Sequence, residues 1–379
     1  MLGKVYGSFF ASRGMFLRPA HILASGGELL ENILSARLRR TFLPFRKKWG
    51  EIQEIRLRSG QPLILRMSGE EWLLDEEGRM GKIEQGTLRV LAEDIQESVA
   101  YICQYSLYAY EDELRQGFIT IRGGHRIGVA GQTAVSDGQV RSISYVSSLN
   151  IRIAHQIKGC GEPFFSYLWE DGRPCHTLII SPPGGGKTTL LRDFIRLFSN
   201  GFEACPGMSV SLVDERSEVG ACYMGIPQND VGMRTDVMAN CPKAEGIQMM
   251  VRSMAPQVVA FDELGGGEDM TAVRSAVQSG CRVLATIHGA DFEDVNQRSI
   301  YGIFERYVCL GGWQQAGRVR KILDQKGKIL FKAVRDVVVE MYRQPINRRR
   351  MWIHWLGEKC SPSASYMDTQ RNESEPDSF

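Results

Sequence analysis

The apolar residues in the first part of the chain follow helical spacing in some places and strand alternation in others. Leu29, Ile33 and Leu38 belong to a three- and four-residue repeat that predicts an amphipathic helix. Short runs that alternate apolar and polar residues predict half-buried strands. The predicted elements are a helix over 28–42, strands over 52–58 and 63–65, a helix over 92–105, and a two-residue hairpin of strands 117–122 and 125–129 around Gly123–Gly124. These elements predict an α+β domain that ends near Ser148.

From His176 onward, short apolar runs alternate with helical segments. The predicted strands cover 177–180, 209–213, 257–261 and 282–286, and the predicted helices cover 188–198, 244–254 and 270–279. Strands that are apolar on both sides must be covered on both faces. This alternation therefore predicts an α/β fold with a mainly parallel sheet.

Changes of composition divide the chain into four expected segments. These are a flexible basic leader over 1–27, an α+β N-terminal domain over 28–150, an α/β domain over 151–342, and a disordered tail over 343–379. The first 48 residues hold nine lysines and arginines against two acids. We interpret this as a solvated arm followed by an amphipathic helix; a surface for lipid, nucleic acid or an acidic partner stays the alternative.

Composition and cysteine usage exclude several classes of protein. The chain has 379 residues, 43% of them hydrophobic and 24% charged, which is typical of a globular protein and not of a disordered or collagen-like one. Apolar runs long enough for a spanning helix or a signal peptide are missing, so we expect neither. Nine cysteines without a C-x-x-C pair favour reduced thiols, and we expect a cytoplasmic protein.

The segment Ser181–Thr189 reads SPPGGGKTT, directly after a predicted strand and at the start of a predicted helix. Its closing Gly-Lys-Thr is that of a P-loop, although Ser181 stands where the first glycine is usual. The predicted phosphate-binding residues are Pro183, Gly184, Gly185, Gly186, Lys187, Thr188 and Thr189. We expect Lys187 to reach the β- and γ-phosphates of ATP and Thr188 to bind Mg²⁺. Together with the α/β alternation, this predicts a RecA-like, AAA-type P-loop NTPase domain.

A P-loop needs an acid at the end of a nearby apolar strand. The run Val258–Glu263 supplies one, and we expect this strand to lie beside the P-loop strand. Asp262 is the predicted Mg²⁺ residue and Glu263 the predicted group that polarises the attacking water. Hydrolysis of ATP is therefore favoured over binding alone.

Two further predicted strands end in polar residues at the same edge of the sheet. Glu215 is a candidate for ordering the attacking water, and His288 is a candidate for sensing the γ-phosphate. Arg216 has two open interpretations, an ion pair with Glu218 or a finger that stabilises charge on the phosphates. The Asn/Thr-Lys-x-Asp run of guanine-specific enzymes is missing, which leaves ATP as the expected nucleotide.

Several strings in the right order resemble the stage III sporulation protein AA family. Besides the P-loop they are RGGHRIG (122–128), LNIRI (149–153), VDERSEVG (213–220), GMRTDV (232–237), CPKAEG (241–246), VRSMAP (251–256) and FDELG (261–265). The resemblance covers about residues 50–335. That family is similar in turn to the hexameric ATPases of type II and type IV secretion and of pilus machines. Those motors usually have Gly-Glu in place of Asp262-Glu263, and charged residues in place of Gly266-Gly267.

The resemblance implies a sporulation ATPase that uses ATP and Mg²⁺. Such a protein acts as a ring-forming homo-oligomer, a hexamer, in the mother-cell cytoplasm. It docks on the cytoplasmic face of a membrane channel built by sister sporulation proteins and energises or gates transport toward the forespore. In the related motors, the strand ends that match Asp214, Glu215 and His288 belong to the nucleotide site. The candidates for arginine contacts with phosphate within or between subunits are Arg122, Arg126, Arg152, Arg216 and Arg252; structural salt bridges stay the alternative.

Two other functions remain open. A P-loop ATPase that acts on single-stranded nucleic acid is favoured by the basic leader and by Arg348–Arg350. Against it, we find no stripe of aromatic and basic residues that would stack bases, so we expect no nucleic-acid partner. A scaffold that binds ATP without hydrolysis is disfavoured because Lys187, Thr188, Asp262 and Glu263 are all present.

Overall fold

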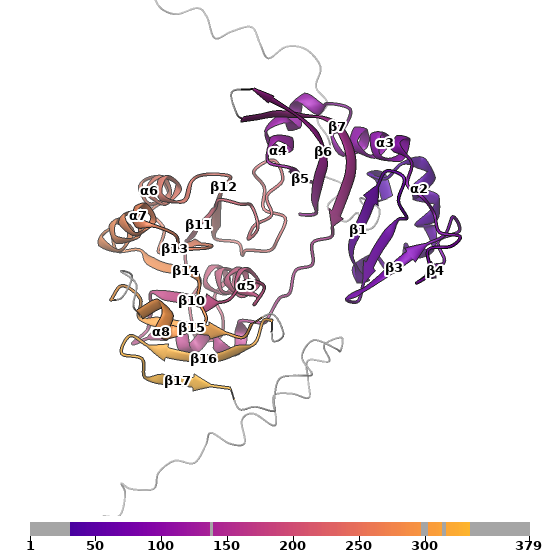
Figure 1. Ribbon diagram of the computed structural model, residues 1–379. Helices are drawn as coiled ribbons and strands as arrows, with labels where there is room; N and C mark the ends of the chain where they lie inside the picture. The colour runs from indigo at the N-terminus through magenta and orange to yellow at the C-terminus, as the bar shows by residue number, and fades with distance from the viewer. Residues whose placement is uncertain (1–30, 137–138, 297–301, 313–315, 334–379) are drawn as a thin grey trace, which may run out of the picture. The chain divides into compact units, whose positions relative to one another are not determined.

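The computed structural model describes residues 31–136, 139–296, 302–312 and 316–333 (Figure 1). The predicted leader and tail, with Arg348–Arg350, lie outside the described residues. Two large sheets carry the fold, one before and one after residue 152. The predicted division into four segments stays a prediction.

The first sheet has seven strands in the order β4-β3-β2-β1-β7-β6-β5, and every neighbouring pair is antiparallel. Its strands are β1 (Ile52–Arg58), β2 (Ile64–Met67), β3 (Glu70–Leu74), β4 (Met80–Gly81), β5 (Phe118–Thr120), β6 (Arg126–Ser136) and β7 (Gln139–Arg152). The helices of this part are α2 (Ala36–Thr41), α3 (Ala92–Ile102) and α4 (Glu111–Arg115). Leu38, Ile55 and Ile95 belong to its single apolar core. The α+β character predicted for this part is therefore confirmed.

Two local predictions for this part were wrong in detail. The helix predicted over 28–42 is interrupted before Ser35, whose side chain accepts the N–H of Leu38 and caps α2. Ser35 also donates its hydroxyl to Asp94, so tertiary contacts fix this break. The turn between β5 and β6 is longer than the predicted two residues, because the last backbone bond runs from the Ile121 N–H to the His125 carbonyl and leaves residues 122–124 in the turn.

The second sheet has eight strands in the order β12-β11-β13-β14-β10-β15-β16-β17. They are β10 (Thr177–Ser181), β11 (Val210–Asp214), β12 (Thr235–Ala239), β13 (Val258–Phe261), β14 (Arg282–His288), β15 (Arg306–Leu310), β16 (Val319–Asp324) and β17 (Ile329–Lys332). Pairing is parallel from β12 to β15 and antiparallel from β15 to β17. The predicted α/β fold with a mainly parallel sheet is confirmed. The sequence analysis missed β12, β15, β16 and β17.

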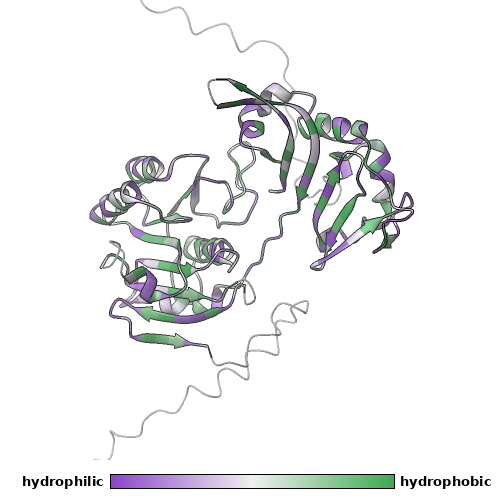
Figure 2. Ribbon diagram, viewed as in Figure 1, coloured by the Kyte–Doolittle hydropathy of each residue, from purple (hydrophilic) through white to green (hydrophobic). Residues whose placement is uncertain are grey.

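Helices cover both faces of the second sheet, and they are α5 (Lys187–Asn200), α6 (Lys243–Met254), α7 (Gly267–Gln278) and the short α8 (Phe292–Asn296). A small hairpin of β8 (Trp169–Glu170) and β9 (Arg173–Pro174) precedes β10. Neighbouring residues of β10 serve opposite cores, because side chains alternate along a strand. Leu178 packs with α6 and α7, whereas Ile179 packs with α5. Figure 2 shows the resulting pattern of hydrophobic strands and helices with mixed faces.

One predicted relationship between strands was wrong. The acid-bearing strand β13 does not pair with the P-loop strand β10; instead β14 lies between them and pairs with both. All three strands run in the same direction, so their carboxyl ends still meet at one edge. This edge carries the candidate site.

Candidate functional site

The loop between β10 and α5 has the backbone geometry that a phosphate cradle needs. Gly184 and Gly186 have φ of 72° and 93°, in the left-handed region that favours glycine. A Cβ atom on Gly185 would lie 1.9 Å from the Ser181 Oγ. Gly186 precedes α5 without a side-chain cap, so the N–H groups of the first turn are available to an anion. The residues present therefore fit a nucleotide phosphate.

Lys187 begins α5, and its buried ammonium group lies at the carboxyl end of the sheet. Its Nζ donates to the carbonyls of Ser181 at 3.2 Å and Pro182 at 3.3 Å. It also lies 3.0 Å from the His288 Nδ1. Burial lowers the pKa of Lys187, although the charges of Asp262 and Glu263 act in the opposite direction. The structure thus brings together two residues that the sequence separates by a hundred positions.

Thr188 and Asp262 also meet, as a magnesium site requires. The Thr188 Oγ1 donates to the Asp262 Oδ2 at 2.6 Å, and the Thr286 hydroxyl donates to the other oxygen of the same carboxylate. Within the described ranges, three or more His, Cys, Asp or Glu never cluster as a metal site by themselves. A hydroxyl and one carboxylate match the way Mg²⁺ is held when nucleotide phosphates supply further ligands. The donor set therefore fits Mg²⁺ bound together with ATP.

Glu263 follows Asp262 and is held by contacts on its backbone and its side chain. Its φ is 60°, which is uncommon for a residue with a side chain. Its Oε2 lies 2.6 Å from the Arg216 Nη1, and its Oε1 lies 3.1 Å from the His288 Nε2. With Lys187 donating to the Nδ1 of His288, a neutral ring can donate its Nε2 hydrogen to Glu263. His288 thus links the P-loop lysine to this carboxylate.

The segment that follows β11 contributes Glu215 and Arg216, whose partners differ from those that the sequence analysis considered. Glu215 pairs with Lys243 at 3.2 Å. The ion pair considered between Arg216 and Glu218 was wrong: Arg216 pairs with Glu263, and Glu218 pairs with Arg126. These side chains reach different partners because they lie on a loop that bends sharply after β11. The pocket beside them measures about 200 Å³ and is lined by Asp214, Glu215, Arg216, Glu218, Lys243, Asp262, Glu263 and Gly265.

Asp214, which the sequence resemblance predicted to belong to the nucleotide site, has its carboxylate turned toward its own loop. The carboxylate is buried and accepts the backbone N–H groups of Glu218 at 2.9 Å and Gly220 at 2.7 Å. It also accepts the N–H of Val219. Burial raises the pKa of this carboxyl group, and the three N–H donors oppose that shift. Asp214 thus shapes the loop that carries Glu215 and Arg216.

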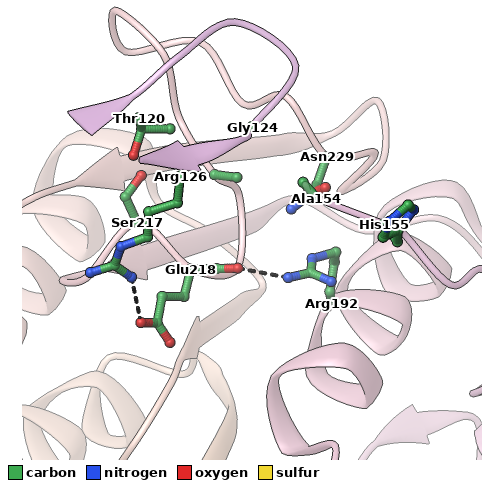
Figure 3. Close-up of a pocket in the computed structure, with 10 residues that line it drawn as sticks. Thr120, Gly124, Arg126, Ala154, His155, Arg192, Ser217, Glu218 and Asn229 are labelled. Atoms are coloured by element: carbon green, nitrogen blue, oxygen red, sulfur yellow. Dashed lines mark hydrogen bonds and ion pairs between the residues drawn. The ribbon is translucent and has the colours of Figure 1, made fainter. Parts of the chain in front are cut away.

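A second pocket of about 180 Å³ lies beside the loop after β11 (Figure 3). Arg126 of β6 pairs there with Glu218 at 2.7 Å and stacks over the Phe118 ring at 3.5 Å. The buried Arg192 of α5 donates to the carbonyls of Glu218 and Val219, both at 2.6 Å. Its contacts tie the P-loop helix to the loop that Asp214 shapes.

The remaining candidate arginines are spread over three elements. Arg122 lies in the turn between β5 and β6, Arg152 ends β7, and Arg252 lies in the last turn of α6; all three are exposed. The register of the sheet places Arg152 opposite Glu54 and Arg126. Their proposed contacts with phosphate stay predictions.

The sequence analysis missed two residues with a clear place in the site, Arg192 and Lys243. Lys243 is buried at the start of α6 and contacts groups from three other segments. A lysine in the first turn of a helix is disfavoured by the helix dipole. This unusual position could have identified Lys243 as a candidate from the sequence. Arg192 follows Lys187 by five positions on α5, and its helical pattern alone gives no such signal.

Within the described residues, helices of the length and apolarity needed to cross a bilayer are absent.

Comparisons with known proteins agree with the sequence resemblance. The family model described as "Sporulation stage III, protein AA" matches residues 26–330. The chain is 40% identical over 292 residues to "Stage III sporulation protein AA" of Bacillus subtilis (strain 168), covering 76% of this chain and 91% of that protein. It is also 23% identical over 308 residues to "Protein SEEDLING PLASTID DEVELOPMENT 1" of Arabidopsis thaliana, covering 76% of this chain and 38% of that protein.

Similar solved structures include an ATPase and a pilus motor. The Legionella pneumophila ATPase DotB aligns with a TM-score of 0.46 at 13% identity, covering 70% of this chain and 73% of DotB. The pilus retraction motor PilT with bound ADP aligns with a TM-score of 0.45 at 14% identity, covering 71% of this chain and 77% of PilT.

Proposed function

This chain belongs to the stage III sporulation protein AA family, and from that premise we propose that it is a Mg-ATP-hydrolysing motor. In this proposal it energises or gates a secretion-like channel between the mother cell and the forespore. One observation carries the ATPase part. The Thr188 hydroxyl and the Asp262 carboxylate, from two elements far apart in sequence, lie 2.6 Å apart at the start of the P-loop helix.

The proposed roles follow from where each group lies. The N–H groups of residues 184–189 cradle the phosphates, and Lys187 supplies a cation beside them. Thr188 and Asp262 hold Mg²⁺, which when bound neutralises charge on the phosphate oxygens. Glu263 accepts a proton from the attacking water, and Glu215 helps to order that water. His288 contacts both Lys187 and Glu263, and these contacts support its proposed role in sensing the γ-phosphate.

We carry the assembly over from the resemblance of the family to hexameric secretion ATPases. The proposal is a homo-oligomeric ring, a hexamer, in the mother-cell cytoplasm. The ring docks on the cytoplasmic face of a membrane channel made of sister sporulation proteins. The exposed Arg122, Arg152 and Arg252 are the proposed contacts between subunits, with Arg126 acting near its own Glu218.

Phosphate release from Mg-ATP by the purified full-length chain tests the ATPase. We expect turnover by the wild type and by Lys326→Ala, which removes an exposed lysine after β16. Lys187→Ala should lose both turnover and tight ATP binding, whereas Glu263→Gln should lose turnover and keep binding. Unchanged turnover in Lys187→Ala would contradict the proposal. Turnover that depends on added single-stranded DNA would favour the nucleic-acid alternative.

Mass photometry of Glu263→Gln with and without Mg-ATP tests the ring. A species with the mass of six chains, whose fraction increases when Mg-ATP is added, supports the ring. A monomer at all nucleotide concentrations contradicts it while leaving the ATPase test intact.

A further inference from the structure

Lys243 is a buried cation that joins three segments at the edge of the second sheet. The residue is only 8% exposed. Its Nζ donates to the backbone carbonyl of Glu263 at 2.6 Å and pairs with Glu215 at 3.2 Å and Asp269 at 3.5 Å. These oxygens come from the ends of β11 and β13 and from the first turn of α7. A buried ammonium group is costly unless it is paired, so these contacts account for its burial.

The place of Lys243 in α6 cannot be explained by the helix itself. It is the first helical residue, where the helix dipole disfavours a positive charge. Pro242 before it supplies no side-chain cap. An acid or a small polar residue would suit this position better. The contacts of Lys243 with other segments are therefore the reason for a lysine here.

The carbonyl that Lys243 binds belongs to a residue in a strained conformation. Glu263 has a φ of 60°, which costs free energy for a residue with a Cβ. Its N–H donates to the Thr286 Oγ1 at 2.8 Å, and its carbonyl accepts from Lys243. On the carbonyl side, the N–H of the same peptide group, that of Leu264, also donates to the Thr286 carbonyl at 2.7 Å. Without Lys243, this peptide group loses one of its two bonds, and Glu263 can turn more easily toward a relaxed conformation.

We propose that Lys243 is a positioning residue that holds Glu263 in its left-handed conformation and so keeps the Glu263 carboxylate in place for hydrolysis. This rests on the proposed ATPase function. Lys243 does not act on ATP itself; it acts through the backbone of Glu263 and through the side chain of Glu215. Both carboxylates line the pocket of about 200 Å³, as does Lys243.

Steady-state turnover of three variants tests the role in hydrolysis. We expect Lys243→Met to lower kcat by about 10- to 100-fold with KM for Mg-ATP within about two-fold, because binding uses other residues. Lys243→Arg should recover part of kcat, since a cation remains. The matched control is Lys321→Met. Lys321 is a half-buried lysine of β16 that pairs with Asp291 at 2.8 Å. The control should keep the wild-type kcat.

Thermal unfolding tests the backbone contact without using turnover. Lys243→Met is made in two backgrounds, Glu263→Gln, which keeps the strain, and Glu263→Gly, which removes it. In the glutamine background, losing Lys243 lets the strained residue 263 relax. The strain released offsets part of the stability that is lost with the Lys243 hydrogen bond. Glycine has no such strain to release. We therefore expect the Tm loss from Lys243→Met to be larger in the glycine background, by about 2–4 °C.

The outcomes separate this inference from the proposed function. If the wild type turns over ATP and Lys243→Met is as fast as Lys321→Met, the positioning role is overturned while the ATPase stands. A Lys243→Arg variant as slow as Lys243→Met also contradicts it. If the wild type shows no turnover, the ATPase proposal fails, and the Tm comparison decides about Lys243. An equal or smaller Tm loss in the glycine background overturns the backbone contact.

Discussion

The Thr188 Oγ1 donates a hydrogen bond of 2.6 Å to the Asp262 Oδ2. The two residues belong to different elements, the P-loop helix α5 and the segment that follows β13. The strand β14 lies between β10 and β13, and it contributes the hydroxyl of Thr286 to the same carboxylate. The Asp262 side chain is therefore oriented by two hydroxyl groups.

Removing the Thr188 hydroxyl should weaken magnesium binding more than nucleotide binding. We expect Thr188→Val to raise the Mg²⁺ concentration for half-maximal binding of a fluorescent ATP analogue by about 10-fold, because one ligand of the ion is lost. Binding of the analogue in EDTA should change little. The control is Thr271→Val, which removes a hydroxyl that bonds to the Gly267 carbonyl on α7. Equal Mg²⁺ dependence in both variants would contradict the role of Thr188.

The pair of Arg216 and Glu263 should restrain the carboxylate rather than stabilise the fold. The Arg216 side chain is 65% exposed, and an exposed ion pair contributes about 0–1 kcal/mol. We expect Arg216→Ala to leave Tm nearly unchanged and to raise basal turnover by up to about five-fold, because Glu263 loses one of its two side-chain partners.

The control for this prediction is Arg79→Ala, which removes an exposed arginine that pairs with Asp75 at 2.6 Å in the first part of the chain. It should change neither Tm nor turnover. A large loss of turnover in Arg216→Ala, with normal folding, would instead favour direct contact between Arg216 and the phosphates.

The sequence predicted the strand ends of the site but not the contacts between them. Lys187, Thr188 and Asp262 could be chosen because a P-loop and an acid after an apolar strand have recognisable patterns. The partner of Arg216 could not, because the loop after β11 bends through the buried carboxylate of Asp214. That bend directs Arg216 to Glu263 and Glu218 to Arg126. Local spacing carries no information about such a tertiary turn.

Two other differences between the predicted and the observed fold, at β12 and before α2, also have physical reasons. The strand β12 has half-exposed and exposed residues at the edge of its sheet, so it lacks the apolar run of a buried strand. The break before α2 depends on Ser35 meeting Asp94 and Ser98, which lie about sixty positions away. Periodicity alone could only extend the helix through that point.

Asp94 should make stability depend on pH in the acid range. Burial disfavours its charged form, but bonds from Arg37, the Leu91 N–H and Ser35 outweigh this and lower its pKa below the ordinary 3.8. Its contribution to stability is therefore fully present above about pH 4 and is lost as pH falls through the lower pKa of the folded state. We expect Asp94→Asn to lower Tm at pH 7, with a difference from the wild type that shrinks below pH 4.

Circular dichroism melts of the wild type and Asp94→Asn between pH 7 and pH 3 measure this difference. The control is Asp324→Asn, because Asp324 accepts backbone N–H groups in an exposed turn between β16 and β17. A Tm difference for Asp94→Asn that stays constant down to pH 3 would contradict the acid-dependent contribution of Asp94 to stability.

Gly185 and Gly266 offer a matched test of the phosphate cradle. A Cβ on Gly185 would lie 1.9 Å from the Ser181 Oγ and 2.6 Å from the Gly311 carbonyl oxygen, so the loop would have to move. A Cβ on Gly266 would meet nothing within 4 Å, and Gly266 has an ordinary negative φ of −81°.

We expect Gly185→Ala to weaken ATP binding by at least about 100-fold, since backbone N–H groups are displaced from the phosphates. Gly266→Ala should bind ATP like the wild type. Isothermal titration with a slowly hydrolysed ATP analogue distinguishes the two, and wild-type affinity in Gly185→Ala would show that the nucleotide binds elsewhere.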